Sequence, residues 1–168
     1  MKQIFLLLIV IIVACSAQKS QELTKEEIGL IKQEIILSYA KHIEDLINLD
    51  YEEVMKFYAD VDDHILFGDG LYWGDYNTID EIWKSFCTKD NKLVLKWDLS
   101  EHHVYVFSRD AASYLVQFDN ERIQTDGDTT KVTGCFSYGM KKFDDEWKVV
   151  TTHVTHNYLP GYDPRVKN

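Results

Sequence analysis

The chain has 168 residues, with 18 basic and 28 acidic side chains, which gives a formal net charge of −10 with histidine neutral. Nucleic-acid binding needs lysine and arginine to displace phosphate counterions, so this balance argues against a nucleic-acid partner. It also disfavours attachment to anionic lipid by charge alone, so we expect membrane contact only through a lipid anchor.

The first fifteen residues have the pattern of a signal peptide. Lys2 precedes an unbroken apolar run over residues 4–13, which ends close to Cys15. Such a run spans only about 15 Å as a helix, about half of a bilayer core. The ending resembles a bacterial lipoprotein signal box, which implies that Cys15 is lipid-modified and becomes the first mature residue. The alternative is simple cleavage after Ala17, with Cys15 lost.

Either processing route predicts an exported protein. A modified Cys15 would anchor it to the bacterial cell envelope, and simple cleavage would leave it secreted or periplasmic. After the leader, residues 16–23 are polar and predict a short tether. Residues 24–158 predict one domain, and residues 159–168 a C-terminal tail.

The two remaining cysteines leave two interpretations open. Cys87 and Cys135 could form a disulfide in an exported compartment, or they could stay reduced as small buried hydrophobes. The sequence has no C-x-x-C pair, so we expect no structural zinc site, and we expect no other metal or cofactor.

Three helices are predicted from capping boxes. In each box a side-chain oxygen accepts a hydrogen bond from a backbone amide in the first helical turn. The boxes are Thr24 with Glu27, Asp50 with Glu53, and Thr78 with Glu81.

The other elements are predicted to be strands. A short strand at residues 63–67 is closed by Gly68-Asp69-Gly70, and residues 71–73 are expected to pair back on it. Short polar turns then separate four β-rich segments, which predicts an antiparallel meander. The segments lie near residues 93–107, 112–125, 130–143 and 147–158. Helices first and an antiparallel sheet after them predict an α+β domain.

This order of elements resembles the nuclear transport factor 2-like superfamily, in particular its SnoaL-like and kinase-association-domain-like branches. Three features carry the resemblance: the helix end Phe57-Tyr58-Ala59-Asp60 before the first strand, the glycine-bearing loop before the third helix, and Trp147 followed by two aliphatics and His153-x-Thr155. It covers residues 24–158. It implies a cone-shaped fold in which three N-terminal helices pack on a curved antiparallel sheet of about five to six strands.

The resemblance places a pocket in the open end of the cone, and the chain has many aromatic residues that could line it. Strand alternation puts Tyr114, Val116 and Phe118 on one face, and Phe136, Tyr138 and Met140 on one face of the next strand. For any single ring a plain core position is the alternative, so only the group predicts a pocket. The candidates are Tyr58, Trp73, Trp83, Trp97, Tyr114, Phe118, Phe136, Tyr138, His153 and His156.

Two of these candidates are histidines three residues apart on the last strand, which must point to opposite faces. The parity of Val154 favours His156 inward, whereas the resemblance draws attention to His153. A pocket imidazole could act as a general base or a polar anchor, and a structural histidine is the alternative. With Asp63, near the expected pocket mouth, these histidines are the candidate catalytic residues, and we assign catalysis to none of them.

Three functions fit this sequence. We expect first a noncatalytic exported protein whose cone binds a small, partly apolar ligand. The second is an interaction module or homodimer that uses the convex face of the sheet, and the third is a SnoaL-like isomerase, cyclase or dehydratase with a pocket His and Asp. An inward polar pair within about 3–4 Å would support the enzyme, and a continuous exposed apolar patch on the sheet would support the dimer.

Overall fold

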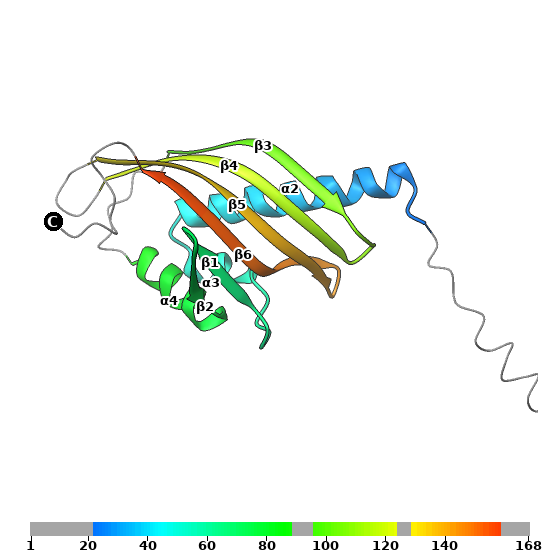
Figure 1. The fold of residues 1–168 in the computed structure, drawn as a ribbon, viewed down its shortest axis with the longest axis horizontal. Coiled ribbons are helices and arrows are strands. Elements are labelled where there is room, and N and C mark those ends of the chain that lie inside the picture. The colour runs from blue at the N-terminus through cyan, green and yellow to red at the C-terminus, as the bar shows by residue number, and fades with distance from the viewer. Residues whose placement is uncertain (1–21, 89–95, 124–128, 159–168) are drawn as a thin grey trace, which may run out of the picture.

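The computed structural model describes residues 22–88, 96–123 and 129–158, and it confirms the α+β fold (Figure 1). Its elements are α2 (Lys25–Ile47), α3 (Tyr51–Lys56), β1 (Ile65–Gly68), β2 (Leu71–Gly74), α4 (Tyr76–Phe86), β3 (Lys96–Val106), β4 (Ala111–Ile123), β5 (Thr129–Phe143) and β6 (Glu146–Tyr158). The leader with Cys15, the first part of the tether and the tail lie outside the described residues. Among the helices that are described, none is both long and apolar enough to cross a membrane.

Two of the three expected helix caps are confirmed. The Thr24 hydroxyl accepts from the amide of Glu27 at 3.1 Å, and the Glu27 carboxylate accepts from the Thr24 amide at 2.7 Å. Asp50 caps α3. The third cap was expected at Thr78, which is wrong. α4 starts earlier because Asp75 is its N-cap and accepts from the Thr78 amide at 3.3 Å.

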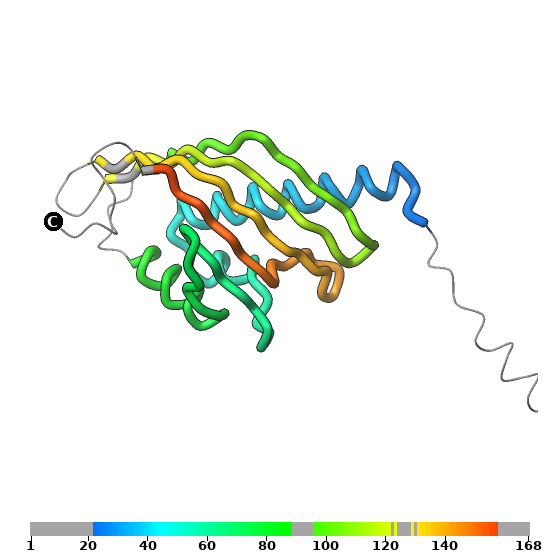
Figure 2. Tube along the Cα trace, viewed as in Figure 1, coloured from blue at the N-terminus to red at the C-terminus, as the bar shows by residue number. Residues whose placement is uncertain are grey.

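All six strands form one sheet in the order β2-β1-β6-β5-β4-β3. The pairing of β1 with β6 is parallel and every other pairing is antiparallel, so the expected meander of β3 to β6 is confirmed. Figure 2 shows the chain reversing between these long strands. The registers shift between Ser100 and His103 and between Gly139 and Met140. Such bulges bend a strand and increase its twist.

Helix α2 crosses one face of this sheet, behind the strands in Figure 1, and the core lies between them. Its Tyr39 ring is fully buried, with its centroid 5.3 Å from that of Tyr114 and 5.5 Å from that of Tyr138. The predicted alternation is confirmed, because Tyr114, Val116, Phe118, Phe136, Tyr138 and Met140 are all buried. The face toward α2 is called the inner face below, and the opposite face the outer face.

Cys87 and Cys135 are separate thiols in this fold. Burial raises the pKa of the Cys87 thiol to about 11. A thiol with so high a pKa is protonated at neutral pH and unreactive, so Cys87 acts as a small hydrophobe.

Candidate functional site

A cavity of about 180 Å³ lies between helix α4 and the inner face of the sheet. Most of its walls are large apolar side chains, and four of its residues carry polar groups: Trp83, Trp97, Asn120 and His156. The complete lining is Ile82, Trp83 and Phe86 from α4, and Trp97, Phe118, Asn120, Val132, Phe136 and His156 from the sheet. An apolar wall with a few polar groups is the usual composition of a small-molecule site.

Cross-strand pairing brings the sheet residues of this cavity together. Trp97 on β3 lies directly opposite Asn120 on β4, and Asn120 lies opposite Val132 on β5. Direct cross-strand neighbours have their Cβ atoms about 5 Å apart, so these three side chains form one row across the sheet. Phe118 and His156 belong to the next row, on either side of Gly134.

Because Gly134 has no side chain, its neighbours in the second row, Phe118 and His156, can lie close together. A Cβ atom at this position would come 2.6 Å from Cζ of Phe118 and 2.2 Å from the backbone oxygen of Thr155. The missing side chain therefore lets the Phe118 ring lie over β5. From there its centroid is 5.9 Å from that of His156 and 4.8 Å from that of Phe136.

Two polar atoms of the first row have no hydrogen-bond partner among the residues that the structure describes. They are the side-chain oxygen Oδ1 of Asn120 and the indole Nε1 of Trp97, and both atoms are buried. Asn120 as a whole is only 6% exposed. Buried polar groups are nearly always paired, because an unpaired one costs about 1–3 kcal/mol. Unpaired buried atoms of this kind also occur in the packed core, on Tyr39, His42, His64 and Thr152, so the two atoms do not by themselves mark a ligand site.

His156, the ionisable residue of the described lining, is held by Asp69. The Asp69 carboxylate accepts the backbone amide of His156 at 2.8 Å, and its Oδ2 lies 3.1 Å from the imidazole Nδ1. The Asp69 side chain is only 5% exposed. The indole of Trp73 stacks on the imidazole, with 6.2 Å between centroids and 10° between planes. The carboxylate and the indole therefore fix the orientation of the imidazole.

The turn between β1 and β2 positions Asp69. Parallel pairing sets Gly68 beside Val154 of β6, and the Asp69 amide donates to the Val154 carbonyl at 2.9 Å. Asp69 has a left-handed backbone with φ of 51°, a conformation that Asp tolerates better than most residues. A non-glycine residue held in this conformation, with a buried carboxylate, is frequent at functional sites.

A second aromatic cluster packs in the cone beside the cavity. Tyr58, Tyr114 and Tyr138 are buried, and burial raises the pKa of each phenol. His42 is also buried, with its ring stacked on Phe57 at 4.4 Å between centroids. Its removal from water lowers its pKa to about 3, so it is neutral at physiological pH.

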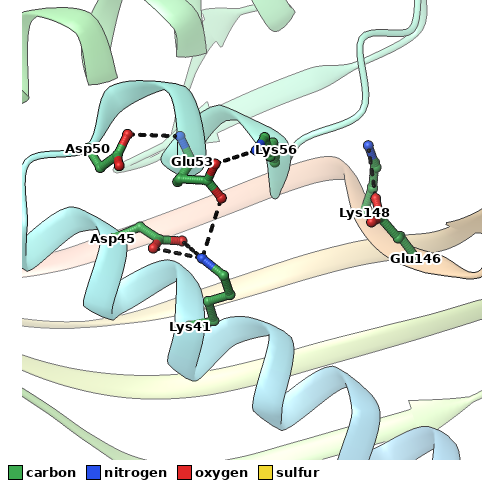
Figure 3. A network of polar contacts seen from close by, with 7 residues as sticks. All are labelled: Lys41, Asp45, Asp50, Glu53, Lys56, Glu146 and Lys148. Carbon is green, nitrogen blue, oxygen red and sulfur yellow. Dashed lines mark hydrogen bonds and ion pairs between the residues drawn. The ribbon is translucent and has the colours of Figure 1, made fainter.

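A larger groove of about 540 Å³ lies outside the cone, between α2, α3 and the turn between β5 and β6. Figure 3 shows the ion pairs along it. The ammonium of Lys41 lies 2.8 Å from both carboxylate oxygens of Asp45 and 3.5 Å from Glu53, which also contacts Lys56. These cations and carboxylates satisfy one another, so we assign no ligand to the groove.

The structure separates the ten predicted pocket residues into groups. Five line the cavity: Trp83, Trp97, Phe118, Phe136 and His156. Three belong to the core instead, namely Tyr58, Tyr114 and Tyr138, because their rows lie where α2 and α3 already fill the cone. Trp73 is more than one third exposed and meets the site only through its stacking on His156.

The remaining pocket candidate, His153, and the separate catalytic candidate Asp63 lie away from the cavity. His153 and His156 are three residues apart on β6, so their side chains point to opposite faces of the sheet. His153 is exposed on the outer face, where it lies beside Phe67 of β1. Asp63 is exposed before β1 and takes no part in the pair formed by His156 and Asp69. Among the described residues no group of three or more potential metal ligands occurs.

Sequence reasoning missed Asp69 and Asn120. Asn120 had a usable signal, because it follows Phe118 by two residues on the same strand and must therefore share its face. Asp69 had no such signal, because the sequence shows it only as a turn residue. Its contact with His156 depends on the pairing of β1 with β6.

Neither a protein-family model nor a curated protein sequence matches this chain. Solved structures do match it. A proposed scytalone dehydratase from Novosphingobium aromaticivorans has a TM-score of 0.73 at 13% identity, over 86% of this chain and 96% of that one. A nuclear transport factor 2-like superfamily protein from Salmonella enterica has a TM-score of 0.63 at 18% identity, over 81% and 97%.

A nuclear transport factor 2-like protein of unknown function from Shewanella oneidensis is also similar, with a TM-score of 0.60 at 22% identity, over 73% of this chain and 97% of that one. These likenesses show that the chain has the nuclear transport factor 2-like fold. At such low identity they carry the fold alone and no activity.

Proposed function

We propose that this chain is an exported, noncatalytic binding protein whose cavity takes a small, partly apolar ligand. The observation that carries the proposal is the cavity of about 180 Å³ between α4 and the inner face of the sheet, whose walls are mostly aromatic and apolar with a few polar residues among them.

The size of the cavity limits the ligand. An apolar cavity of about 150 Å³ in another protein binds benzene. The cavity here is slightly larger, at about 180 Å³, and rings of Trp83, Phe118 and Phe136 line it. The part of a ligand that this space can enclose is therefore about the size of one ring.

Native mass spectrometry of the full chain, purified gently from its source, tests the proposal. We expect a stoichiometric extra mass that disappears on denaturation. Val132→Phe fills the cavity and should abolish the extra mass, whereas Thr133→Phe, on the exposed outer face, should retain it. A clean ligand-free mass for the unaltered chain would contradict the proposal, and circular dichroism checks that both variants fold.

Export and anchoring are a separate part of the proposal, supported by the leader and by the signal box that ends at Cys15. Labelling of bacteria with radioactive palmitate should mark the chain and place it in the membrane fraction. Cys15→Ala should lose the label, whereas Cys135→Ala should keep it. An unlabelled, soluble exported chain would favour simple cleavage after Ala17.

The pair formed by His156 and Asp69 favours a second candidate function, a proton-transferring enzyme. It is the inward polar pair expected of an isomerase, cyclase or dehydratase, and its two atoms are 3.1 Å apart. A carboxylate on Nδ1 orients an imidazole for general acid–base work. If this candidate is correct, the ligand identified by mass spectrometry should be converted over time, and His156→Gln should stop its conversion while leaving it bound.

A third candidate, the dimer, has weaker support. Ile65, Phe67, Leu71 and Tyr72 are exposed on β1 and β2, and the rings of Phe67 and Tyr72 are in contact. This patch covers one edge of the sheet. The neighbouring outer face carries the polar Thr151 and His153, so the apolar surface is not continuous. Sedimentation of the unaltered chain and of Phe67→Asp measures whether this edge joins two copies.

A further inference from the structure

We infer that the ligand of this cavity carries a small quaternary ammonium group, which the aromatic rings of the cavity wall enclose. The inference rests on the proposed function, because it names the chemical class of the ligand for the same cavity. Three properties of the described lining carry it: its rings, its charge and the kind of hydrogen-bonding groups that it offers.

Aromatic rings make up most of the cavity wall, and they come from both of its sides. Five of the nine lining residues carry a phenyl or indole ring: Trp83 and Phe86 from α4, and Trp97, Phe118 and Phe136 from the sheet. Neighbouring rings are inclined by 84° between Trp83 and Phe86 and by 50° between Trp97 and Phe118, so they do not stack into one flat wall. A compact, rounded group contacts such rings better than a flat one does. The face of an aromatic ring attracts a cation, most strongly at tryptophan.

The charge around the cavity favours a cation over an anion. The described lining includes no lysine or arginine. Its ionisable group, the His156 imidazole, lies 3.1 Å from the Asp69 carboxylate, whose side chain is only 5% exposed. This pair is anionic when the imidazole is neutral and has no net charge when it is protonated, so it repels a cation in neither state. The net charge of −10 over the chain also draws cations toward the protein.

The hydrogen-bonding groups of the wall select a quaternary ammonium over one with N–H groups. A primary ammonium has three N–H donors, which need acceptors once they leave water. The indole N–H groups of Trp83 and Trp97 can only donate, and the side-chain oxygen of Asn120 is buried out of reach of a ligand. A quaternary ammonium has no N–H group and leaves no donor unpaired. Its methyl groups together have about the bulk of the single ring that the cavity encloses.

Three probes test this inference on the full chain by ligand-observed NMR titration: choline, its uncharged analogue in which carbon replaces the nitrogen, and ethanolamine. We expect choline to bind at least about tenfold more tightly than either of the others. Cation–π contacts favour choline over the analogue, and its lack of N–H groups favours it over ethanolamine. Trp97→Leu removes a ring and Asp69→Asn removes a charge, so each should weaken choline severalfold and leave the uncharged analogue nearly unchanged.

A quaternary ammonium can reach the cavity as a free solute or as a lipid headgroup, and flotation with phosphatidylcholine vesicles distinguishes these sources. Release of vesicle-bound chain by excess choline would identify the headgroup. For a chain that binds choline in the titration, flotation that excess choline does not change would identify a free solute. Both results support the quaternary ammonium and differ only in its source.

Tyr72→Leu and Asp63→Asn are the matched controls. Tyr72 and Asp63 are exposed and lie outside the cavity lining, so loss of a ring or a charge there should keep the preference for choline. Equal binding of choline and its uncharged analogue, or tighter binding of the analogue or of ethanolamine, would overturn the inference and leave the proposed function standing. If no probe binds, the inference fails, and the mass spectrum of the source-purified chain then shows whether the proposed function fails with it.

Discussion

Acid should destabilise this protein through His42, whose position in the core makes the effect calculable. Its ring is 2% exposed and stacks on Phe57, and its Nε2 lies 3.5 Å from the Tyr58 hydroxyl. Desolvation lowers the pKa of His42 from 6.5 to about 3, and the Lys41 ammonium adds to the shift. The backbone of Val54 acts in the opposite direction and raises the pKa of His42 slightly, although it forms no well-formed hydrogen bond with Nδ1.

The sign of the effect follows from proton binding. Between the two pKa values the unfolded chain binds a proton at His42 that the native state does not bind, so stability falls as the pH falls below about 6.5. Each pKa unit corresponds to about 1.4 kcal/mol. The native state should therefore lose about 3 kcal/mol at pH 4.5 from His42 alone, and about 5 kcal/mol once the pH is below about 3.

Urea unfolding followed by circular dichroism at pH 7.5 and at pH 4.5 measures this loss. His64, whose pKa burial also lowers, and the carboxylates contribute to the total, so the comparison is between variants. His42→Phe keeps an aromatic ring and should remove about 3 kcal/mol of the acid-induced loss. His103→Phe changes an exposed histidine, so this variant should lose as much free energy of unfolding between pH 7.5 and pH 4.5 as the unaltered chain. Equal losses in all three proteins would refute the assignment to His42.

Three further substitutions test the framework of the fold and site by urea unfolding. Thr24→Ala removes the α2 cap and should cost about 1 kcal/mol; no change would mean that the first turn is frayed. Gly134→Ala forces a methyl group into Phe118 and should cost about 1–3 kcal/mol, and a neutral result would show that the ring does not lie there. Asp69→Ala removes two hydrogen bonds from His156 and should cost about 2 kcal/mol, which Asp69→Asn should partly restore.

The sequence predicted most of the fold because the signals are local. The capping pairs Thr24 with Glu27 and Asp50 with Glu53 act over three residues, and both caps are present. The alternation in β4 and β5 extends along single strands. It correctly assigns the inward face, because every second residue of a half-buried strand must avoid water. At the third helix two local signals competed, and Asp75 proved the effective cap in place of Thr78.

The site was harder to predict because it depends on two things: the face of the sheet to which a side chain points, and the position of the residue along its strand. Tyr138 and Phe136 share a face, yet the former is core and only the latter lines the cavity. That difference is set by how far α2 and α3 extend over the sheet. The residue pattern of a single strand does not indicate which part of it a helix covers. The partnership of Asp69 with His156 depends on parallel pairing between β1 and β6, which joins distant segments.

That same parallel pairing predicts an order of assembly for the molecule. Strands β3 to β6 join through reversals between neighbours, so their contacts close short loops. The contact of β1 with β6 joins residues 86 positions apart, such as Ile65 and Thr151, and contacts of such long range form slowly. The helices and the meander can therefore associate before Asp69 reaches His156. During synthesis, the pair of Asp69 and His156 can form only after the last strand, β6, has left the ribosome.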